Sequence, residues 1–267
     1  DRDRGRENRG APSGGPVVPP RTMDYLTQLI TPVCGAPRGA TTDDRQAMLL
    51  INEIYPAICG ESRFSGRPCT LVRLTGCHVR CAWCDSAHSF SGGESLTVGD
   101  VAAAVRDHGF RTVLVTGGEP LLQRDLVPLC EVLLDDGRTV LLETSGTLGP
   151  PNMLALAEVP AGVHRIVDLK APASAIPADR IDWDGLKGLG AADDVKIVCA
   201  DRADYEWGRD IVRAGERIPP AARVCFSPAH GALAARELAG WILADGLDAD
   251  FQIQLHKAVW PDVARGV

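Results

Sequence analysis

Short β-rich runs alternate with helical patterns along most of this chain. At 97–108, Val98, Val101, Ala102 and Val105 recur at helical spacing and form one apolar face. The same alternation continues to the C-terminal region. It predicts strands at 70–74, 112–116, 139–142, 164–169, 195–198, 223–226 and 251–255, and helices at 97–108, 121–135, 203–214 and 232–244, with Gly137 as the C-cap of the second helix.

Strands that alternate with helices form βαβ units, whose strands run parallel. Several of the predicted strands end in polar or glycine-rich segments. Binding sites of parallel sheets lie at the carboxyl ends of the strands. The pattern therefore predicts an α/β fold with a parallel sheet and a site along one edge of it.

The first part of the chain lacks this periodicity. Residues 1–22 are rich in Arg, Gly, Pro and Asp, and they cannot bury enough apolar surface to offset the entropy of ordering. Met23 is a candidate for the natural start, and residues 31–45 are interrupted by Pro and Gly. We predict a disordered or loop-like segment over 1–45 and one core domain over 46–267.

Composition narrows the function classes. The 267 residues are 45% hydrophobic and carry a net charge of −7, so a basic face for nucleic acid is not expected. No apolar run approaches the roughly 20 residues of a membrane span, and no signal peptide is visible. Three of the nine cysteines fall within eight residues, which indicates a metal or redox site rather than disulfides. We expect a cytoplasmic protein with no membrane partner.

The clustered cysteines follow the strand predicted at 70–74. Cys77, Cys81 and Cys84 have the spacing C-x3-C-x2-C. Three thiolates can hold a [4Fe–4S] cluster by three irons and leave the fourth iron open for reaction. Trp83, directly before the third cysteine, could shield such a group. This aromatic residue and the position of the loop directly after a strand both favour the cluster.

Two other interpretations of the cysteines stay open. A structural zinc site needs a fourth ligand, for which His78 and His88 are nearby candidates. The three residues could also be buried cysteines that lie together by chance.

A glycine-rich turn, Thr116-Gly117-Gly118-Glu119-Pro120, follows one βα unit later. Glycines let the backbone approach a ligand closely, and Glu119 suits a cationic amino group. Alone, the segment could be a βα turn with proline at the first helical position. Its place after the cysteines favours a cofactor contact.

Other polar residues stand at strand ends. Arg73 suits a bidentate grip on a carboxylate, or a surface salt bridge. Glu143 is a candidate ligand contact, although it could simply belong to a βα turn. Lys170 is a candidate cofactor contact, although it could simply be a solvated surface charge. Near the C-terminus, alternation places Gln252, Gln254 and His256 on one strand face, which suits either a heterocycle or a polar edge strand.

Together these segments resemble the 7-carboxy-7-deazaguanine synthase family of radical S-adenosylmethionine enzymes. The resemblance runs from about Ile51 to Lys257. It is carried by the segments Cys59-Gly60-Glu61-Ser62, Gly66-Arg67-Pro68, Arg73 to Cys77, Cys81 to Ser86, Thr116 to Gln123, Glu143 to Gly146 and Gln254 to Lys257. The cysteines alone specify only the superfamily, whereas the run from Thr116 and the late Gln, His and Lys specify the family.

The resemblance implies an open, partial (β/α) barrel with a parallel sheet, in a homodimer. It implies a carbon–nitrogen lyase of 7-deazapurine (queuosine-type) biosynthesis, which converts 6-carboxy-5,6,7,8-tetrahydropterin to 7-carboxy-7-deazaguanine and ammonia by radical ring contraction. The implied cofactors are a [4Fe–4S] cluster, S-adenosylmethionine and Mg2+, and the implied electron donor is a flavodoxin or ferredoxin.

The family's residues carry over position by position. Cys77, Cys81 and Cys84 would ligate the cluster, and Ser86 would bind Mg2+. The S-adenosylmethionine contacts would be Gly118, Glu119, Glu143, Asp168, Leu169 and Lys170. The pterin contacts would be Ile58, Cys59, Gly60, Glu61, Arg73, Thr116, Gln254 and His256.

This sequence departs from the family pattern in four places. Cys59 replaces a glutamine, and Ser86 replaces the threonine that binds Mg2+. Asp168 and Leu169 replace the Ser-Pro often found before the lysine, and the chain continues past His-Lys to Val267. Two other functions remain as alternatives: a radical activase that makes a glycyl radical on a partner protein, and a zinc-stapled binding module.

Overall fold

A computed structural model describes residues 43–263, 265 and 266. The predicted disordered or loop-like segment 1–45 therefore lies almost wholly outside the described residues. Its last three residues belong to a short helix, α2 (Asp43–Gln46).

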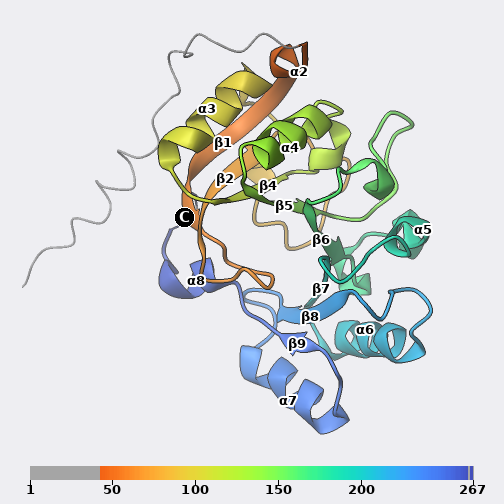
Figure 1. Ribbon diagram of the computed structural model, residues 1–267. Helices are drawn as coiled ribbons and strands as arrows, with labels where there is room; N and C mark the ends of the chain where they lie inside the picture. Colours follow the sequence, from red (N-terminus) through yellow and green to blue (C-terminus); the bar gives the residue numbers. More distant parts are fainter. Residues whose placement is uncertain (1–42, 264, 267) are drawn as a thin grey trace, which may run out of the picture.

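The described part of the chain is built around one nine-stranded sheet, whose strands lie in the order β3-β1-β2-β4-β5-β6-β7-β8-β9 (Figure 1). All pairings from β2 to β9 are parallel, as predicted. The strands are β1 (Met48–Ile58), β2 (Pro68–Leu74), β3 (Glu94–Thr97), β4 (Thr112–Gly117), β5 (Thr139–Thr144), β6 (His164–Leu169), β7 (Asp194–Cys199), β8 (Arg223–Pro228) and β9 (Asp250–Phe251).

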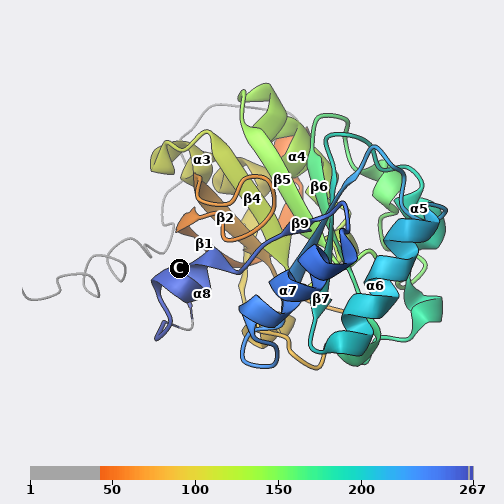
Figure 2. The ribbon, with the colours of Figure 1, turned by 90° about the horizontal axis from the view of Figure 1, so that it is seen from below.

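The longer helices pack on the outer face of the curved sheet (Figures 1 and 2). These are α3 (Val98–His108), α4 (Leu126–Asp135), α6 (Arg202–Ala214) and α7 (Ala235–Asp245), and the short helices α5 (Trp183–Leu186) and α8 (Leu255–Val259) complete the set. Among the described residues, no helix combines the length and the apolar character that crossing a membrane requires.

Alternation along the strands divides the sheet into two faces. In β4, Val113 and Val115 pack in the main core under the helices, whereas Leu114 belongs to a second apolar cluster. In β6, Val167 likewise joins the main core and Ile166 the second cluster. The inner face therefore has an apolar floor, and polar residues stand above it toward the strand ends.

The first predicted helix is confirmed. Thr97 caps α3 by accepting a hydrogen bond from the Asp100 backbone, and the Asp100 side chain bonds back to Thr97. Gly109 ends the helix with a φ of 76°, a left-handed conformation that glycine adopts without strain.

The helix predicted at 121–135 begins later, at Leu126. Residues 120–122 form a 3-10 turn instead, η2 (Pro120–Leu122). Gln123 explains the break, because its side chain donates to the carbonyl oxygens of Leu50 and Thr75 and accepts from the Leu50 amide. The helix ends at Asp135 as predicted, but the C-cap is Asp136, and Gly137 follows it with a φ of 73°.

Two features of the sheet were not predicted. β1 and β3 form an antiparallel edge, so the parallel prediction holds only from β2 onward. The strand predicted at 251–255 is wrong beyond Phe251, because Leu255 begins α8 and its amide donates to the Gly60 carbonyl. The chain leaves the sheet here and turns toward the loop after β1.

Candidate active site

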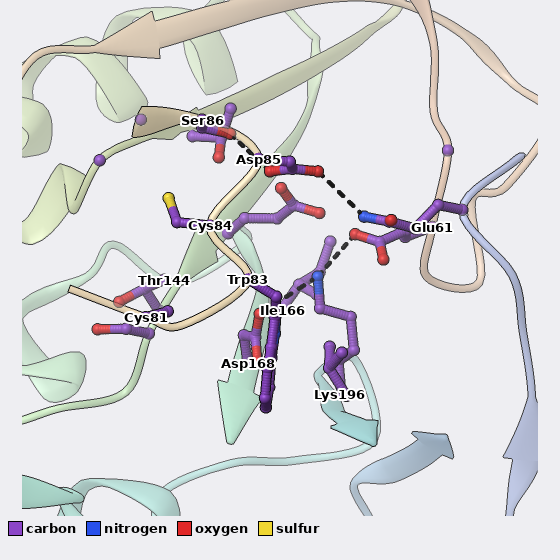
Figure 3. A pocket seen from close by; sticks show the side chains of 18 of the residues that line it. Glu61, Cys81, Trp83, Cys84, Asp85, Ser86, Thr144, Ile166, Asp168 and Lys196 are labelled. Carbon is purple, nitrogen blue, oxygen red and sulfur yellow. Dashed lines mark hydrogen bonds and ion pairs between the residues drawn. The ribbon is translucent and has the colours of Figure 1, made fainter. Parts of the chain in front are cut away.

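A cavity of about 470 Å3 lies on the inner face, at the carboxyl ends of the strands. Five neighbouring strands contribute polar residues to its wall, among them Arg73 from β2, Thr116 from β4, Glu143 from β5, Asp168 from β6 and Lys196 from β7. Figure 3 shows the cysteine loop on one side of the cavity and Glu61 with Lys196 on the other.

The cysteine loop brings all three clustered thiols to this cavity. Cys77, Cys81 and Cys84 line it, and none of them is in a disulfide. Burial raises the pKa of the Cys77 and Cys81 thiols, so these groups become strong ligands only when a metal centre displaces their protons.

The loop is fixed to the fold by backbone hydrogen bonds. The Gly76 amide donates to Ser89 at 2.8 Å, and the Ala82 amide donates to Ser174 at 3.0 Å. The Glu119 amide donates to the Gly76 carbonyl at 2.8 Å. Backbone hydrogen bonds therefore fix the loop just before its first cysteine, between its second and third cysteines, and to the glycine turn that packs against it.

The donor set of this loop fits an iron–sulfur cluster. A structural zinc ion needs four ligands, and the two nearby imidazoles have other partners: His78 bonds to the Thr147 hydroxyl and His88 to Glu53. A [4Fe–4S] cluster can be held by three thiolates, each on a separate iron.

The glycine turn packs directly on the first cysteine. A Cβ added to Gly118 would lie 2.3 Å from the Gly76 carbonyl oxygen and 2.7 Å from the Cys77 Cβ. A Cβ added to Gly117 would lie 2.5 Å from the Leu74 carbonyl oxygen. These glycines are needed because two backbone segments meet without room for side chains.

Glu119 ties this turn to the next strand. Its Oε1 accepts hydrogen bonds from the Leu121 amide at 3.1 Å and the Thr144 hydroxyl at 2.7 Å. Its Oε2 accepts from the Ser145 amide at 2.8 Å and the Ser145 hydroxyl at 2.6 Å. The carboxylate is fully buried and does not line the cavity, so its direct effect is to join the ends of β4 and β5.

Buried charges at the ends of β6 and β7 form another part of the cavity wall, and Lys170 among them lies next to Cys81. The Lys196 ammonium lies 2.6 Å from Glu61 Oε2 and 3.5 Å from Asp168 Oδ2, and Lys170 lies 3.0 Å from the same Asp168 oxygen. Burial raises the pKa of Glu61, and Lys196 opposes that rise. Burial also opposes the charge of Lys196, but Glu61 and Asp168 outweigh it and raise the lysine pKa well above its usual value.

A second polar group surrounds Ser86. The Arg73 guanidinium donates to the Ser86 hydroxyl at 3.3 Å and to Glu53 at 2.9 Å. Ser86 donates to Asp85 Oδ1 at 2.9 Å. Burial alone would raise the pKa of Glu53, but Arg265, Arg73 and His88 outweigh it and hold that pKa below its usual value. Glu53 therefore balances the charge of Arg73.

Most of the predicted site residues line the same cavity. Those whose side chains or backbone reach it are Ile58, Gly60, Glu61, Arg73, Cys77, Cys81, Cys84, Ser86, Thr116, Gly118, Glu143, Asp168, Lys170, Gln254 and His256. Three predicted residues do not line it: Cys59 packs in the second apolar cluster, Leu169 packs in the main core, and Glu119 is covered by Thr144 and Ser145.

Several residues of the site were missed by the sequence analysis, chiefly Glu53, Asp85 and Lys196. Lys196 left a signal, because it is a charged residue in the middle of an otherwise apolar strand. Glu53 left none, since β1 itself was not predicted.

Similar proteins agree with this geometry. The profile of the Radical SAM superfamily matches residues 71–169, which include the three cysteines and the glycine turn. The 7-carboxy-7-deazaguanine synthase of Koribacter versatilis is 40% identical over 231 residues, which cover 81% of this chain and 99% of the relative. The corresponding protein of Chlorobaculum tepidum is 38% identical over 83% of this chain and 99% of its own.

This chain belongs to the 7-carboxy-7-deazaguanine synthase family. The fold agrees as well: the crystal structure of QueE from Escherichia coli superposes with a TM-score of 0.58 at 22% identity, over 78% of this chain and 94% of that one. The predicted α/β fold with an open, partial barrel is confirmed at this level. Family membership also confirms the radical S-adenosylmethionine superfamily and makes the zinc-module alternative unnecessary.

Proposed function

We propose that this protein is a radical S-adenosylmethionine lyase that converts 6-carboxy-5,6,7,8-tetrahydropterin to 7-carboxy-7-deazaguanine and ammonia, for 7-deazapurine biosynthesis. The observation that carries the proposal is the near full-length similarity to synthases of this name, together with one cavity that holds all three cysteines. The glycyl-radical activase alternative has no comparable support.

In the proposed enzyme, the cluster and S-adenosylmethionine supply the one-electron chemistry that starts the ring contraction. Cys77, Cys81 and Cys84 would hold the cluster in the loop that follows the C-terminal end of β2. Gly118, Glu143 and Lys170 would hold S-adenosylmethionine beside it. The apolar floor made by Leu71, Leu114 and Ile166 would exclude water below the reacting atoms.

The remaining polar wall would bind the pterin. Arg73 would meet the substrate carboxylate, and Glu61, Thr116, Gln254 and His256 would surround its ring. Gly60 and His256 lie in contact here, since a Cβ added to Gly60 would lie 2.1 Å from His256 Nδ1 and would displace the imidazole. The loop after β1 and the start of α8 would therefore contribute to the same part of the pterin site.

The direct test is an anaerobic turnover assay. Reconstituted protein with reductant, Mg2+ and S-adenosylmethionine should form the deazaguanine acid from the carboxylated tetrahydropterin. We expect Cys84→Ala to lose bound iron and all turnover, whereas Cys130→Ala, at a buried position in α4, should retain the iron. An intact cluster with no conversion of this substrate would refute the proposed function.

We also propose a Mg2+ site at Ser86. A hydroxyl oxygen suits this hard cation, and the neighbouring Asp85 carboxylate adds negative charge. Ser86→Ala should raise the Mg2+ concentration for half-maximal activity by about tenfold, and Ser86→Thr should not raise it. A Mg2+ titration of the three proteins checks this, and equal requirements would contradict the site.

The remaining parts of the proposal come from family membership alone. They are a homodimer and a flavodoxin or ferredoxin as the electron donor. A cytoplasmic location is proposed because a cysteine-bound cluster and free thiols call for a reducing compartment.

A further inference from the structure

Lys196 occupies an unusual position for a charged residue. It lies in β7, in the interior of the sheet, and its side chain is only 8% exposed. It pairs directly with Asp168 of β6 in the strand register. An ammonium that is buried this deeply must be matched by acceptors, and the structure provides two.

The two acceptors come from different elements of the fold. Glu61, on the loop after β1, receives a hydrogen bond from Lys196 at 2.6 Å. Asp168 anchors the same ammonium from β6 at 3.5 Å. Lys196 is therefore held on the sheet by Asp168 while it holds Glu61, as Figure 3 shows.

This arrangement leaves one Glu61 oxygen open. Glu61 Oε1 is buried and has no hydrogen-bond partner among the described residues, and the same is true of Asp168 Oδ1. Buried acceptors are normally satisfied, so open ones in a cavity are suited to donors on a bound molecule.

We infer that Lys196 is a positioning residue of the substrate site, which holds Glu61 by Oε2 and turns it so that Oε1 accepts a hydrogen bond from the substrate ring. The inference rests on the proposed function, because a pterin carries ring N–H and amino donors that match such an acceptor. A charged acceptor binds a donor more strongly than a neutral one does.

Without the ammonium, Glu61 would lose the partner that fixes its orientation, and its pKa would rise further. Burial already favours its neutral form, and Glu143 and Asp168 push in the same direction. A protonated Glu61 would offer a hydroxyl donor and a weaker acceptor to the donor groups of the ring. The loss would appear in pterin binding and would depend on Glu61.

A double-mutant cycle in binding tests this. The dissociation constant of the carboxylated tetrahydropterin is measured by calorimetry on cluster-loaded, unreduced protein with S-adenosylmethionine. Lys196→Met and Glu61→Gln should each weaken binding by about 10- to 100-fold. The double variant should be within about threefold of Glu61→Gln, because Lys196 acts through that residue.

Lys187→Met is the matched control. Lys187 is also a lysine in an ion pair, but it is 62% exposed and lies outside the cavity. Its replacement should leave the dissociation constant unchanged. If Lys196→Met fails to fold, the double variant, which leaves no unpaired charge at Glu61, is compared with Glu61→Gln alone.

The pH dependence separates positioning from a general effect on folding. The charged or titratable groups that face Glu61 are Lys196, Glu143, Asp168, His256 and the buried Cys225 of β8. In Lys196→Met, the loss of binding on the acid side should move to higher pH, and in the double variant this shift should disappear. If Lys196 had a purely structural role, the pH at which binding is lost on the acid side would not change.

Three outcomes would overturn the inference: unchanged binding in Lys196→Met, losses that multiply in the double variant, or an acid limb that does not move. Failure of the proposed function looks different, because the unaltered, cluster-loaded protein would then neither bind nor convert the pterin.

Discussion

At the scale of single residues, Glu119 shows how a predicted ligand can act through the protein. The sequence pattern assigns its carboxylate to S-adenosylmethionine. In the structure both oxygens are occupied by two backbone amides and two hydroxyls, from Leu121, Thr144 and Ser145. Its effect on a cofactor would then come from the geometry of the two strand ends that it joins.

Replacing Glu119 with Gln should therefore destabilise the protein. An amide cannot accept four hydrogen bonds, so at least one buried donor loses its partner, which costs about 1–3 kcal/mol. Urea unfolding of the cluster-free protein measures this. Glu131→Gln, at an exposed site on α4, is the control and should change the free energy of unfolding by less than about 0.5 kcal/mol. Equal stabilities of the two variants would contradict the assignment.

At the scale of elements, the glycine turn and the cysteine loop meet without room for a side chain between them. Gly118 and the Gly76-Cys77 segment come from different βα units, yet a single carbon added to Gly118 would collide with the Gly76 carbonyl and the Cys77 Cβ. The turn therefore sets where the first thiol stands.

Gly118→Ala should separate the turn from the loop and lower the iron content of the reconstituted protein. It should also lower the melting temperature, because the atoms in the way are backbone atoms and cannot move aside cheaply. Gly240→Ala in α7 is the matched control. A Cβ there meets no atom within 4 Å, so alanine should stabilise the helix by roughly 0.5–1 kcal/mol. Full iron loading of Gly118→Ala would show that the contact tolerates the change.

The parallel strands and longer helices could be predicted because they are strongly patterned. The buried strands from β2 to β8 read as short apolar runs with glycine or polar residues after them. β1 could not be recognised, because Pro56 lies inside this strand and the pattern of buried and exposed positions along it is mixed. The proline is tolerated where β1 pairs antiparallel with β2. The alternating pattern at 251–255 predicted a strand, but the Leu255 amide donates to the Gly60 carbonyl and the chain leaves the sheet after Phe251.

The site was predictable where a motif marks it and not where long-range packing builds it. The three thiols, Gly118 and Glu61 stand in recognisable segments. Arg73 donates to Ser86 and to Glu53 of β1, and Glu53 also accepts from Arg265 near the C-terminus; only the folded chain brings these residues together. Cys59 was assigned by position, but its side chain turns away into an apolar cluster.

At the scale of the whole molecule, ion pairs join distant segments at the opposite ends of the strands. Asp193 accepts hydrogen bonds from Arg165 and the Gly190 amide, and the neighbouring Asp194 accepts from Arg63. Burial alone would raise the pKa of Asp193, but the bonds from Arg165 and Gly190 outweigh it and hold that pKa below its usual value.

A carboxyl whose pKa is lowered by folding stabilises the protein above its unfolded pKa and loses that effect as the pH falls. Asp193→Asn should cost about 3 kcal/mol near neutral pH, since it breaks a buried ion pair. The difference from the unaltered protein should shrink below about pH 4. Urea unfolding of cluster-free protein over this range measures it, with the exposed Asp248→Asn as control. A difference that is constant with pH would contradict the role of this charge.

The uneven exposure of the three cysteines bears on how a reagent in solvent would meet them. Cys84 is exposed, whereas Cys77 and Cys81 are half-buried in a loop that backbone hydrogen bonds hold in place. In the cluster-free protein a thiol-alkylating reagent should therefore modify Cys84 before the other two, so chemical labelling could mark one thiol of the three without unfolding the chain.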